Sequence, residues 1–193
     1  MEATLGTKNQ IRQVAQNLFR ERGYSATSMR DLAESLDIKA ASLYYHIKSK
    51  EEILQEICFR IADEFFEAIE KIDFKKKNTS TLLHQAISAH VNVIIKNLDA
   101  AAVFFHEWKH LSEPYLEDFI KLRKKYESIF RKIIKAGIRN KDFENININF
   151  TVLTIFSTIN WVYDYYKPSG SMSPNEISKQ LSNIIINGIL IKK

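Results

Sequence analysis

The sequence predicts an all-α protein with about nine helices. Gly and Pro are scarce, with five and three among 193 residues, whereas β-sheets need many tight turns. Apolar residues recur at every third or fourth position along most of the chain, which is the spacing of one helical face. Ser-x-x-Asp at Ser28 and Ser-x-x-Glu at Ser173 mark two helix N-termini. These observations favour a helical protein of one average domain or two small ones.

The N-terminal part of the chain predicts three helices. The first runs from about Thr7 and ends at Gly23. Ser28 caps a short second helix, and Asp37 lies where the chain must turn sharply, because Asp tolerates a left-handed backbone. Residues 39–47 form the third helix. Two short helices that cross over a tight turn are a helix-turn-helix, whose second helix enters the major groove of DNA.

The rest of the chain predicts one connecting helix and five body helices. An uninterrupted apolar pattern extends from Ser49 to about Ile72, and the polar stretch FKKKNTST at residues 74–81 predicts a solvated turn. The body helices are expected at residues 82–97, 100–110, 114–137, 149–166 and 173–190. Apolar residues surround the fourth of these on nearly all sides, so this helix is expected to be central.

A long stretch of the N-terminal part resembles the DNA-binding domain of the TetR family of transcriptional repressors. It reads VAQNLFRERGYSATSMRDLAESLDIKAASLYYHIKSKEEIL and lies within residues 11–54. Asp37, Lys39 and Ile47 stand where the family often has Gly, a small hydroxyl residue and Phe. The resemblance implies that DNA is contacted by Thr27, Lys39, Ala40, Ala41, Ser42, Tyr44, Tyr45, His46 and Lys50. Hydroxyl and ammonium groups near helix N-termini are natural phosphate ligands.

The net charge of the chain does not by itself indicate DNA binding. The chain carries +5, of which residues 1–52 hold +1 and the remainder +4. DNA binding therefore depends on where the lysines of the helix-turn-helix point, and the alternative is a packing motif that binds no nucleic acid. Residues 121–141 hold nine Lys or Arg against one Glu. This run is expected to be a solvated helix face, the alternative being a phosphate-binding surface beside a ligand pocket.

The body shows a second resemblance. FFHEWKHL, RKKYESIF and NWVYDYYKPSGSMSPNEI are similar to the C-terminal domain of TetR-family regulators of fatty-acid and related acyl-chain catabolism, which respond to acyl-CoA thioesters. Polar residues among the aromatic residues of the helix at 149–166 need partners, either in neighbouring helices or in a bound ligand. The effector site is expected to be lined by Phe104, Phe105, Trp108, Arg123, Tyr126, Phe130, Phe156, Asn160 and Trp161. The CoA phosphates are expected near Lys109, Arg123, Lys124 or Arg131.

The sequence HEWKH at residues 106–110 matches the H-E-x-x-H pattern of zinc proteases. A catalytic zinc needs a third protein ligand, and no downstream residue is singled out for that role. The longer metzincin pattern also fails, because Glu stands where it needs Gly. A zinc hydrolase that uses His106, Glu107 and His110 is thus a remote alternative. No catalytic residue, metal or cofactor is expected.

These patterns predict a homodimeric TetR-type repressor that a small molecule, an acyl-CoA, releases from its operator. Dimerisation is expected through the helices at residues 149–166 and 173–190, whose apolar residues exceed what one body can cover. Two recognition helices in a dimer imply a double-stranded DNA operator that is an inverted repeat. The expected domains are a helix-turn-helix DNA-binding domain at residues 1–52 and a ligand-binding and dimerisation domain at residues 53–193.

The alternative effector is a cationic drug, as in efflux control. It would need carboxylates such as Glu107 or Asp164 aimed into an aromatic pocket. The single cysteine, Cys58, excludes an internal disulfide and suits a reducing cytoplasm. No signal peptide or membrane span is recognisable, so a cytoplasmic protein without a membrane partner is expected.

Overall fold

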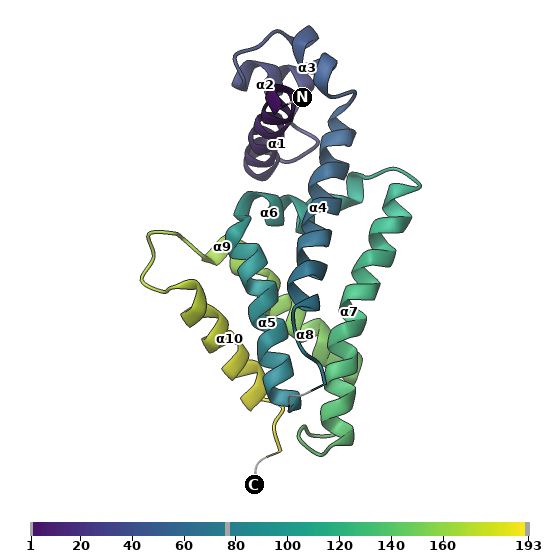
Figure 1. The fold of residues 1–193 in the computed structure, drawn as a ribbon, viewed down its shortest axis with the longest axis vertical. Helices are drawn as coiled ribbons and strands as arrows, with labels where there is room; N and C mark the ends of the chain where they lie inside the picture. Colours follow the sequence, from purple (N-terminus) through teal and green to yellow (C-terminus); the bar gives the residue numbers. More distant parts are fainter. Residues whose placement is uncertain (1, 76–77, 192–193) are drawn as a thin grey trace. The chain divides into compact units, whose positions relative to one another are not determined.

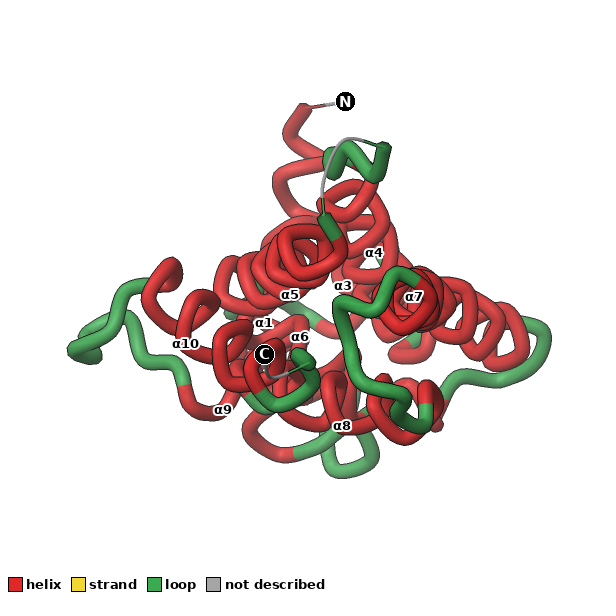
Figure 2. The backbone as a smooth tube through the Cα atoms, turned by 90° about the horizontal axis from the view of Figure 1, so that it is seen from below, coloured by secondary structure: helices red, strands yellow, loops and turns green. Residues whose placement is uncertain are grey.

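A computed structural model describes the backbone of residues 2–75 and 78–191, which form helices joined by loops (Figures 1 and 2). The helices are α1 (Glu2–Arg22), α2 (Met29–Ser35), α3 (Ala40–His46), α4 (Lys50–Glu70), α5 (Thr79–Lys96), α6 (Leu98–His106), the 3-10 turn η1 (Trp108–His110), α7 (Tyr115–Arg139), α8 (Ile148–Asn160), α9 (Val162–Tyr165) and α10 (Pro174–Asn187). Over these ranges the one β-type contact is an isolated bridge between Phe143 and Leu190. The all-α prediction is confirmed. No described helix is both long and apolar enough to cross a bilayer.

The helix boundaries differ from the expected ones at three places. α1 begins at Glu2 instead of Thr7. The helix expected at residues 100–110 ends at His106 and is followed by η1, and the one expected at residues 149–166 is divided at Trp161 into α8 and α9. No Gly or Pro marks either interruption, so the apolar pattern runs across both. Of the turn expected at residues 74–81, residues 79–81 belong to α5 instead, and Lys76 and Lys77 lie outside the described residues.

The local signals at helix ends are confirmed. Ser28 and Ser173 each form a capping box with the acidic residue three positions later. The Ser49 hydroxyl caps α4 through the N–H of Glu52, whose carboxylate accepts the N–H of Lys48. Asp37 and Gly23 have φ angles of 53° and 84°, so both turns use the left-handed region.

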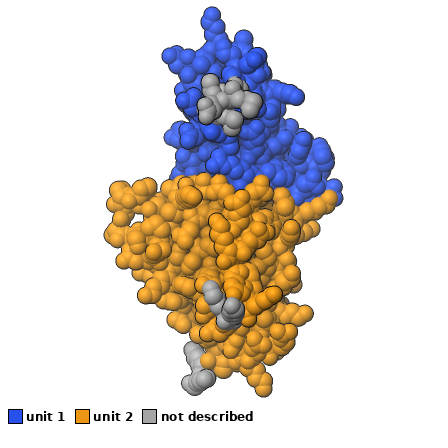
Figure 3. Space-filling model, viewed as in Figure 1, with its two compact units in different colours: residues 1–61, 99–120 blue, residues 62–98, 121–193 orange. Residues whose placement is uncertain are grey.

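The chain divides into two compact units (Figure 3). The first comprises Met1–Ile61 and Asp99–Ile120, and the second comprises Ala62–Leu98 and Lys121–Lys193. α4 and α7 each contribute residues to both units. The segment Asp99–Ile120, expected in the C-terminal domain, thus groups with the N-terminal helices. A functional domain boundary between residues 52 and 53 stays a prediction.

In the first unit, α1, α2 and α3 pack against one another. α2 and α3 have seven residues each and are too short to be stable alone, so the apolar residues that the three helices share hold the arrangement together. The fully buried side chains of this core include Ile11, Phe19, Leu32, Leu43 and Ile47. Burying each of them stabilises the fold by roughly 1.5–3 kcal/mol. The opposite face of α3 is thereby left to solvent.

In the second unit, α5 packs against α8, α9 and α10. The inner face of α5 is completely buried and includes Leu83, Ala86, Ile87, Val91 and Ile94. The expectation that the helix at residues 149–166 is the central one is wrong for the single chain. α8 leaves Phe150 and Leu153 exposed, whereas α5 occupies the centre of this unit.

Candidate DNA-binding surface and effector site

Helices α2 and α3 form the helix-turn-helix. The N–H of Asp31 donates to the Ser28 hydroxyl at 3.2 Å, and the Asp31 carboxylate accepts the N–H of Ser28 at 2.7 Å, which fixes the start of α2. The hydroxyl and the N–H of Ser28 both donate to the Asp31 carboxylate, and these two hydrogen bonds lower the pKa of Asp31. After α2 the left-handed backbone of Asp37 redirects the chain into α3. Leu43, which is completely buried, then fixes which face of α3 points inward.

The outer face of α3 is exposed. Tyr45 is 84% exposed and Tyr44 is 53% exposed. The other exposed members of the expected DNA-contacting set are Lys39, Ala40, Ala41 and Ser42. His46 is half-buried beside the ring of Tyr45. Side-chain hydroxyl, ammonium and small apolar groups on one exposed helix face are what contacts to phosphates and base edges require.

Thr27 occupies a different environment from an exposed phosphate ligand. It lies in the α1–α2 loop (residues 23–28) and is only 1% exposed. Its hydroxyl donates to the carbonyl oxygen of Gly23 at 2.9 Å. A buried hydroxyl whose proton is already used cannot reach a phosphate. In this structure Thr27 supports the α1–α2 loop, and its contact with DNA stays a prediction.

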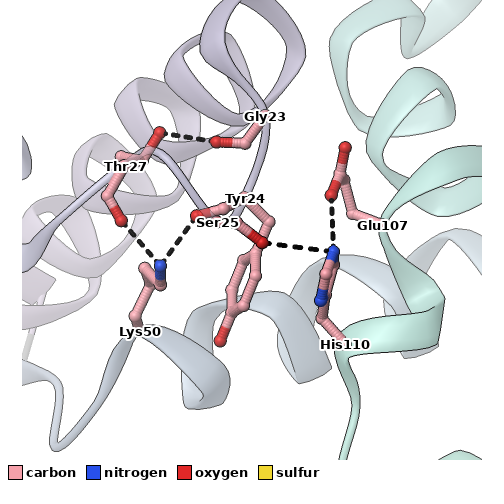
Figure 4. A network of polar contacts seen from close by, with 7 residues as sticks. All are labelled: Gly23, Tyr24, Ser25, Thr27, Lys50, Glu107 and His110. Atoms are coloured by element: carbon pink, nitrogen blue, oxygen red, sulfur yellow. Dashed lines mark hydrogen bonds and ion pairs between the residues drawn. The ribbon is translucent and has the colours of Figure 1, made fainter.

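The sequence also predicts Lys50 as a phosphate ligand, but its ammonium group binds the same loop (Figure 4). Nζ donates to the carbonyl oxygens of Tyr24 and Thr27, each at 2.7 Å, and lies 4.1 Å from the centre of the Tyr24 ring. Burial lowers the pKa of Lys50, while Asp31 and Glu107 act in the opposite direction. An ammonium group has three donors, and two are committed to these carbonyls.

The α1–α2 loop also contacts the segment that follows α6 (Figure 4). The His110 ring stacks on Tyr24, with the ring centres 5.1 Å apart. His110 Nε2 lies 3.5 Å from the Ser25 hydroxyl and 3.4 Å from the Glu107 carboxylate. To bind a carboxylate, Nε2 must carry a proton. The loop is thus held by α4 and by the α6–η1 segment together.

In the second unit, His90 lies among buried aromatic side chains. Its ring stacks on Phe65 at 4.4 Å between ring centres and meets Phe156 edge-on at 5.5 Å. Its Nε2 lies 2.9 Å from Asn160 Oδ1, and its Nδ1 lies 3.3 Å from the Tyr126 hydroxyl. An amide oxygen only accepts, so Nε2 carries the proton and Nδ1 accepts from the tyrosine.

Burial keeps this group uncharged. It lowers the pKa of His90 to about 3, against the opposing effect of the Asn160 hydrogen bond, and it raises the pKa of Tyr126. The imidazole is therefore neutral at physiological pH. A few neutral polar groups within an aromatic environment are typical of sites that orient an otherwise apolar ligand.

Two family models match the chain. The model described as "Bacterial regulatory proteins, tetR family" matches residues 11–57, which contain the helix-turn-helix. The model described as "Tetracyclin repressor-like, C-terminal domain" matches residues 77–189, more than half of the chain. The chain belongs to the TetR family.

Similar proteins include other TetR-type regulators. The HTH-type transcriptional repressor KstR2 of Rhodococcus jostii is 26% identical over 193 residues, covering 95% of this chain and 91% of the relative. The structure of the ketosteroid transcriptional regulator KstR2 of Mycobacterium tuberculosis has a TM-score of 0.89 at 23% identity, covering 96% of both chains. AibR, solved in complex with isovaleryl coenzyme A and operator DNA, has a TM-score of 0.76 at 19% identity, covering 93% of this chain and 96% of AibR.

As a TetR-family member, the chain is a transcriptional repressor that binds operator DNA, dimerises and responds to a small-molecule effector. The zinc-hydrolase alternative is wrong, because the family consists of regulators and not enzymes. The structure also shows why the match was fortuitous. His106 ends α6 and His110 ends η1, so the two do not share one α-helical face, and Glu107 pairs with His110. The described residues contain no group of three or more His, Cys, Asp or Glu that could hold a metal.

The residues predicted to line the effector site are found in both compact units. In the first unit, the rings of Phe104 and Trp108 contact Phe119, and Phe105 lies against Phe104. The predicted residues that surround His90 in the second unit are Tyr126, Phe130, Phe156 and Asn160. Arg123 is half-buried on α7. Their contact with an effector stays a prediction.

Trp161 lies on the surface instead of in the aromatic group around His90. It is 54% exposed and lines a cleft of about 430 Å³ formed by α9 and the loop before α10. The ring of Tyr165 lies 5.2 Å from that of Trp161. Asp164 and Lys167 place one charge of each sign in the same cleft.

The basic run on α7 is mainly a solvent-exposed helix face. Its exposed members are Lys121, Lys124, Lys125, Lys132, Lys135, Arg139 and Lys141. Arg131 instead pairs with Glu127 at 3.1 Å and donates to Asn149. Near the end of α7, Lys132, Lys135 and Arg139 line a groove of about 600 Å³ together with apolar side chains that include Ile146 and Ile148. The solvated-face interpretation therefore accounts for most of the run.

Helices α8 and α10 leave large apolar side chains exposed. Phe150, Leu153 and Ile184 are 70%, 64% and 69% exposed. These side chains lie on the helices through which the sequence predicts dimerisation, and their contact with a second copy stays a prediction. A partner on this face would also explain why α8 is apolar on nearly all sides.

The roles of His90 and Tyr24 were not predicted from the sequence. His90 follows Ala86 and precedes Ile94 by four positions each, so it lies on the buried face of α5. A polar residue on a continuous apolar face is a signal that could have been found. Tyr24 carries no such signal, because its contacts with Lys50 and His110 join distant parts of the sequence.

Proposed function

We propose that this TetR-family repressor is released from its operator by acyl-CoA thioesters. The observation that carries the proposal is the combination on α7 of an aromatic inner face and a cationic outer face. Tyr126 and Phe130 are buried beside His90, whereas Lys121, Lys124 and Lys125 are exposed. An acyl chain with one carbonyl group suits the inner face, and the anionic CoA head suits the outer one.

Similar proteins support this effector class. AibR has the same fold and was solved with isovaleryl coenzyme A and operator DNA. The relatives named KstR2 include a ketosteroid transcriptional regulator. Both names fit large apolar compounds or their CoA thioesters as effectors. The two solved structures are 23% and 19% identical to this chain, so they support the effector class by analogy of fold alone. The proposal of an acyl-CoA effector therefore rests on the chemistry of the residues in this chain.

The proposed DNA contacts are those residues of the expected set that are exposed on and just before α3. They are Lys39, Ala40, Ala41, Ser42, Tyr44 and Tyr45, with the half-buried His46 at the end of the helix. A dimer presents two such faces, so we propose an inverted-repeat operator with half-site centres about one helical turn apart or somewhat more. Footprinting on DNA fragments that the protein retains would show two protected half-sites. The proposed functional domains are residues 1–52 and 53–193, in a protein that acts in the cytoplasm.

The experiment that tests the effector class is a DNA-release titration. Protein bound to a fluorescent operator duplex is titrated with acyl-CoA thioesters of several chain lengths, beside free CoA and the free acids. We expect thioesters to release the duplex at lower concentration than either half of the molecule, because chain and head bind different groups. Phe130→Ala should raise the concentration of thioester needed, while Phe74→Ala, at an exposed position, serves as the control. Release by none of the thioesters would contradict the proposal.

A second candidate effector is an organic cation. The cleft beside Trp161 and Tyr165 contains the Asp164 carboxylate, and a cation next to both aromatic faces and a carboxylate is favourably placed. Lys167 in the same cleft opposes it. Release of the duplex by a cationic dye, lost in Asp164→Asn, would favour this candidate over the acyl-CoA.

A further inference from the structure

The α1–α2 loop is held by residues that are far apart in the sequence. Lys50 lies in the first turn of α4, His110 ends η1, and Tyr24 of the loop lies between them (Figure 4). Lys50 binds two loop carbonyls, and His110 covers the Tyr24 ring and approaches the Ser25 hydroxyl. The loop conformation therefore depends on both side chains.

The loop in turn fixes where α2 begins. Thr27, whose carbonyl oxygen binds Lys50, directly precedes Ser28, the N-cap of α2. The Thr27 hydroxyl is tied to Gly23 at the end of α1. A displaced loop would displace the start of α2, and α3 packs against α2. The recognition helix would then lose its position relative to the recognition helix of the other subunit in the dimer.

Further polar contacts join the α6–η1 segment to the N-terminal helices. Arg20 of α1 pairs with Asp99 of α6 at 2.6 Å. The N–H of Ser112 donates to the Glu51 carboxylate at 2.8 Å, and this hydrogen bond lowers the pKa of Glu51. All of these residues belong to the first compact unit. Exposed pairs of this kind stabilise little individually, so their effect is on geometry.

We propose that Lys50 and His110 are positioning residues for operator binding. They set the α1–α2 loop and the start of α2 without touching DNA. Two observations carry this inference: the Lys50 ammonium group is occupied by backbone carbonyls, and His110 comes from the segment Asp99–Ile120, outside the helix-turn-helix. The DNA-binding unit thus extends to the α6–η1 segment. This inference requires DNA binding but does not depend on the class of effector.

The test measures affinity for a DNA duplex, selected from a random-sequence library, as a function of salt. A lysine that contacts phosphate contributes about 0.9 to the slope of log affinity against log salt, or about 1.8 for the two copies in a dimer. We expect Lys50→Met to lower affinity about tenfold, the scale of one lost charge-assisted hydrogen bond, with the wild-type slope. Lys48→Met removes the same charge from an exposed neighbour and controls for general attraction to DNA.

Tyr24→Leu is a second variant that leaves every cation in place. A positioning role predicts reduced affinity at unchanged slope, because the ring that separates Lys50 from His110 is gone. A phosphate-contact role for Lys50 predicts no loss. His110→Gln should lower affinity as well, and His84→Gln, in the other compact unit, is its matched control. Because the two side chains act on one loop, the losses of Lys50→Met and His110→Gln should not be additive in the double variant.

Unfolding curves recorded for each variant separate positioning from loss of fold. If Lys50→Met does not fold, Tyr24→Leu and His110→Gln carry the test. A slope shallower by about 1.8 in Lys50→Met would make Lys50 a phosphate ligand and overturn the inference. Unchanged affinity in both folded Tyr24→Leu and His110→Gln would overturn it too.

Discussion

Two polar networks, one in each compact unit, differ in charge and in burial. The network at the α1–α2 loop uses the Lys50 ammonium group and the Glu107 carboxylate, and both charged side chains are half-buried. The network around His90 uses a neutral imidazole, an amide and a phenol, and His90 and Tyr126 are buried among aromatic rings. These differences in charge and burial have different physical consequences.

The difference indicates which network sets geometry and which sets stability. Half-buried charges interact with water in the folded and unfolded states alike, so their net contribution to stability is small. A fully buried neutral group has lost its water, so each missing partner leaves an uncompensated polar atom. We therefore expect variants at the loop to change operator affinity and variants around His90 to change the free energy of unfolding.

The largest expected effect is in the aromatic group around His90. Phe65 stacks on His90 and is 2% exposed, so Phe65→Ala should lower the free energy of unfolding by about 3–5 kcal/mol through the cavity that it leaves. Phe74→Ala, at an exposed position, should cost less than about 1 kcal/mol. Urea unfolding at equal protomer concentration measures both. Equal small losses would show that this group is not a tightly packed core.

The second-largest expected effect is the pH dependence of the free energy of unfolding. The pKa of His90 is about 3 in the folded protein, below the value of about 6.5 for an unfolded chain. As pH falls below about 6.5 the unfolded state takes up the proton first, so stability is lost on acidification. Between about pH 7 and pH 5 the free energy of unfolding should fall by about 2 kcal/mol on account of His90 alone.

His90→Gln tests this directly, since glutamine can still donate to Asn160 and accept from Tyr126. The variant should lose about 2 kcal/mol of the pH dependence that the wild type shows over the same interval. His84→Gln, whose parent side chain bonds to Ser182, should keep it. Identical pH profiles for His90→Gln and the wild type would mean that the pKa of His90 is the same in the folded and unfolded states.

The two networks differ in how far the sequence alone predicts their contacts. The helix-turn-helix was predictable because its signals are local: the Ser28 cap, the turn at Asp37 and the apolar position of Leu43 lie within a few residues. His90 was predictable in part, from its place on an apolar helix face. The loop network was not, because Lys50 and His110 meet only through the folded positions of α4 and η1.

Contacts that the sequence pattern does not encode also account for the other differences between expectation and structure. Thr27 is adjacent in sequence to exposed residues, but its hydroxyl turns back to Gly23, which no periodicity encodes. The apolar pattern of residues 149–166 indicated a central helix, whereas a single chain leaves part of α8 exposed. A pattern of burial cannot distinguish a core from an interface with a second copy. The interruption at Trp161 lacks any Gly or Pro that would have marked it.

The smallest expected change in stability comes from the removal of the Tyr126 hydroxyl oxygen. Tyr126→Phe removes the donor to His90 Nδ1 and leaves the ring packing intact. It should lower the free energy of unfolding by about 1–2 kcal/mol, the cost of a buried acceptor without a partner. A change below about 0.3 kcal/mol would mean that water replaces the hydroxyl and that this network is less dry than its burial indicates.

The most direct test measures operator affinity and the free energy of unfolding on the same two variants, Lys50→Met and Tyr126→Phe. We expect opposite outcomes. Lys50→Met should lose about tenfold in affinity with a change in unfolding free energy below about 1 kcal/mol, since burial already disfavours its charge. Tyr126→Phe should lose stability and keep the operator affinity of the ligand-free protein. If Tyr126→Phe lowers affinity as much as Lys50→Met, or if Lys50→Met is the more strongly destabilised, the division of roles between the two networks is contradicted.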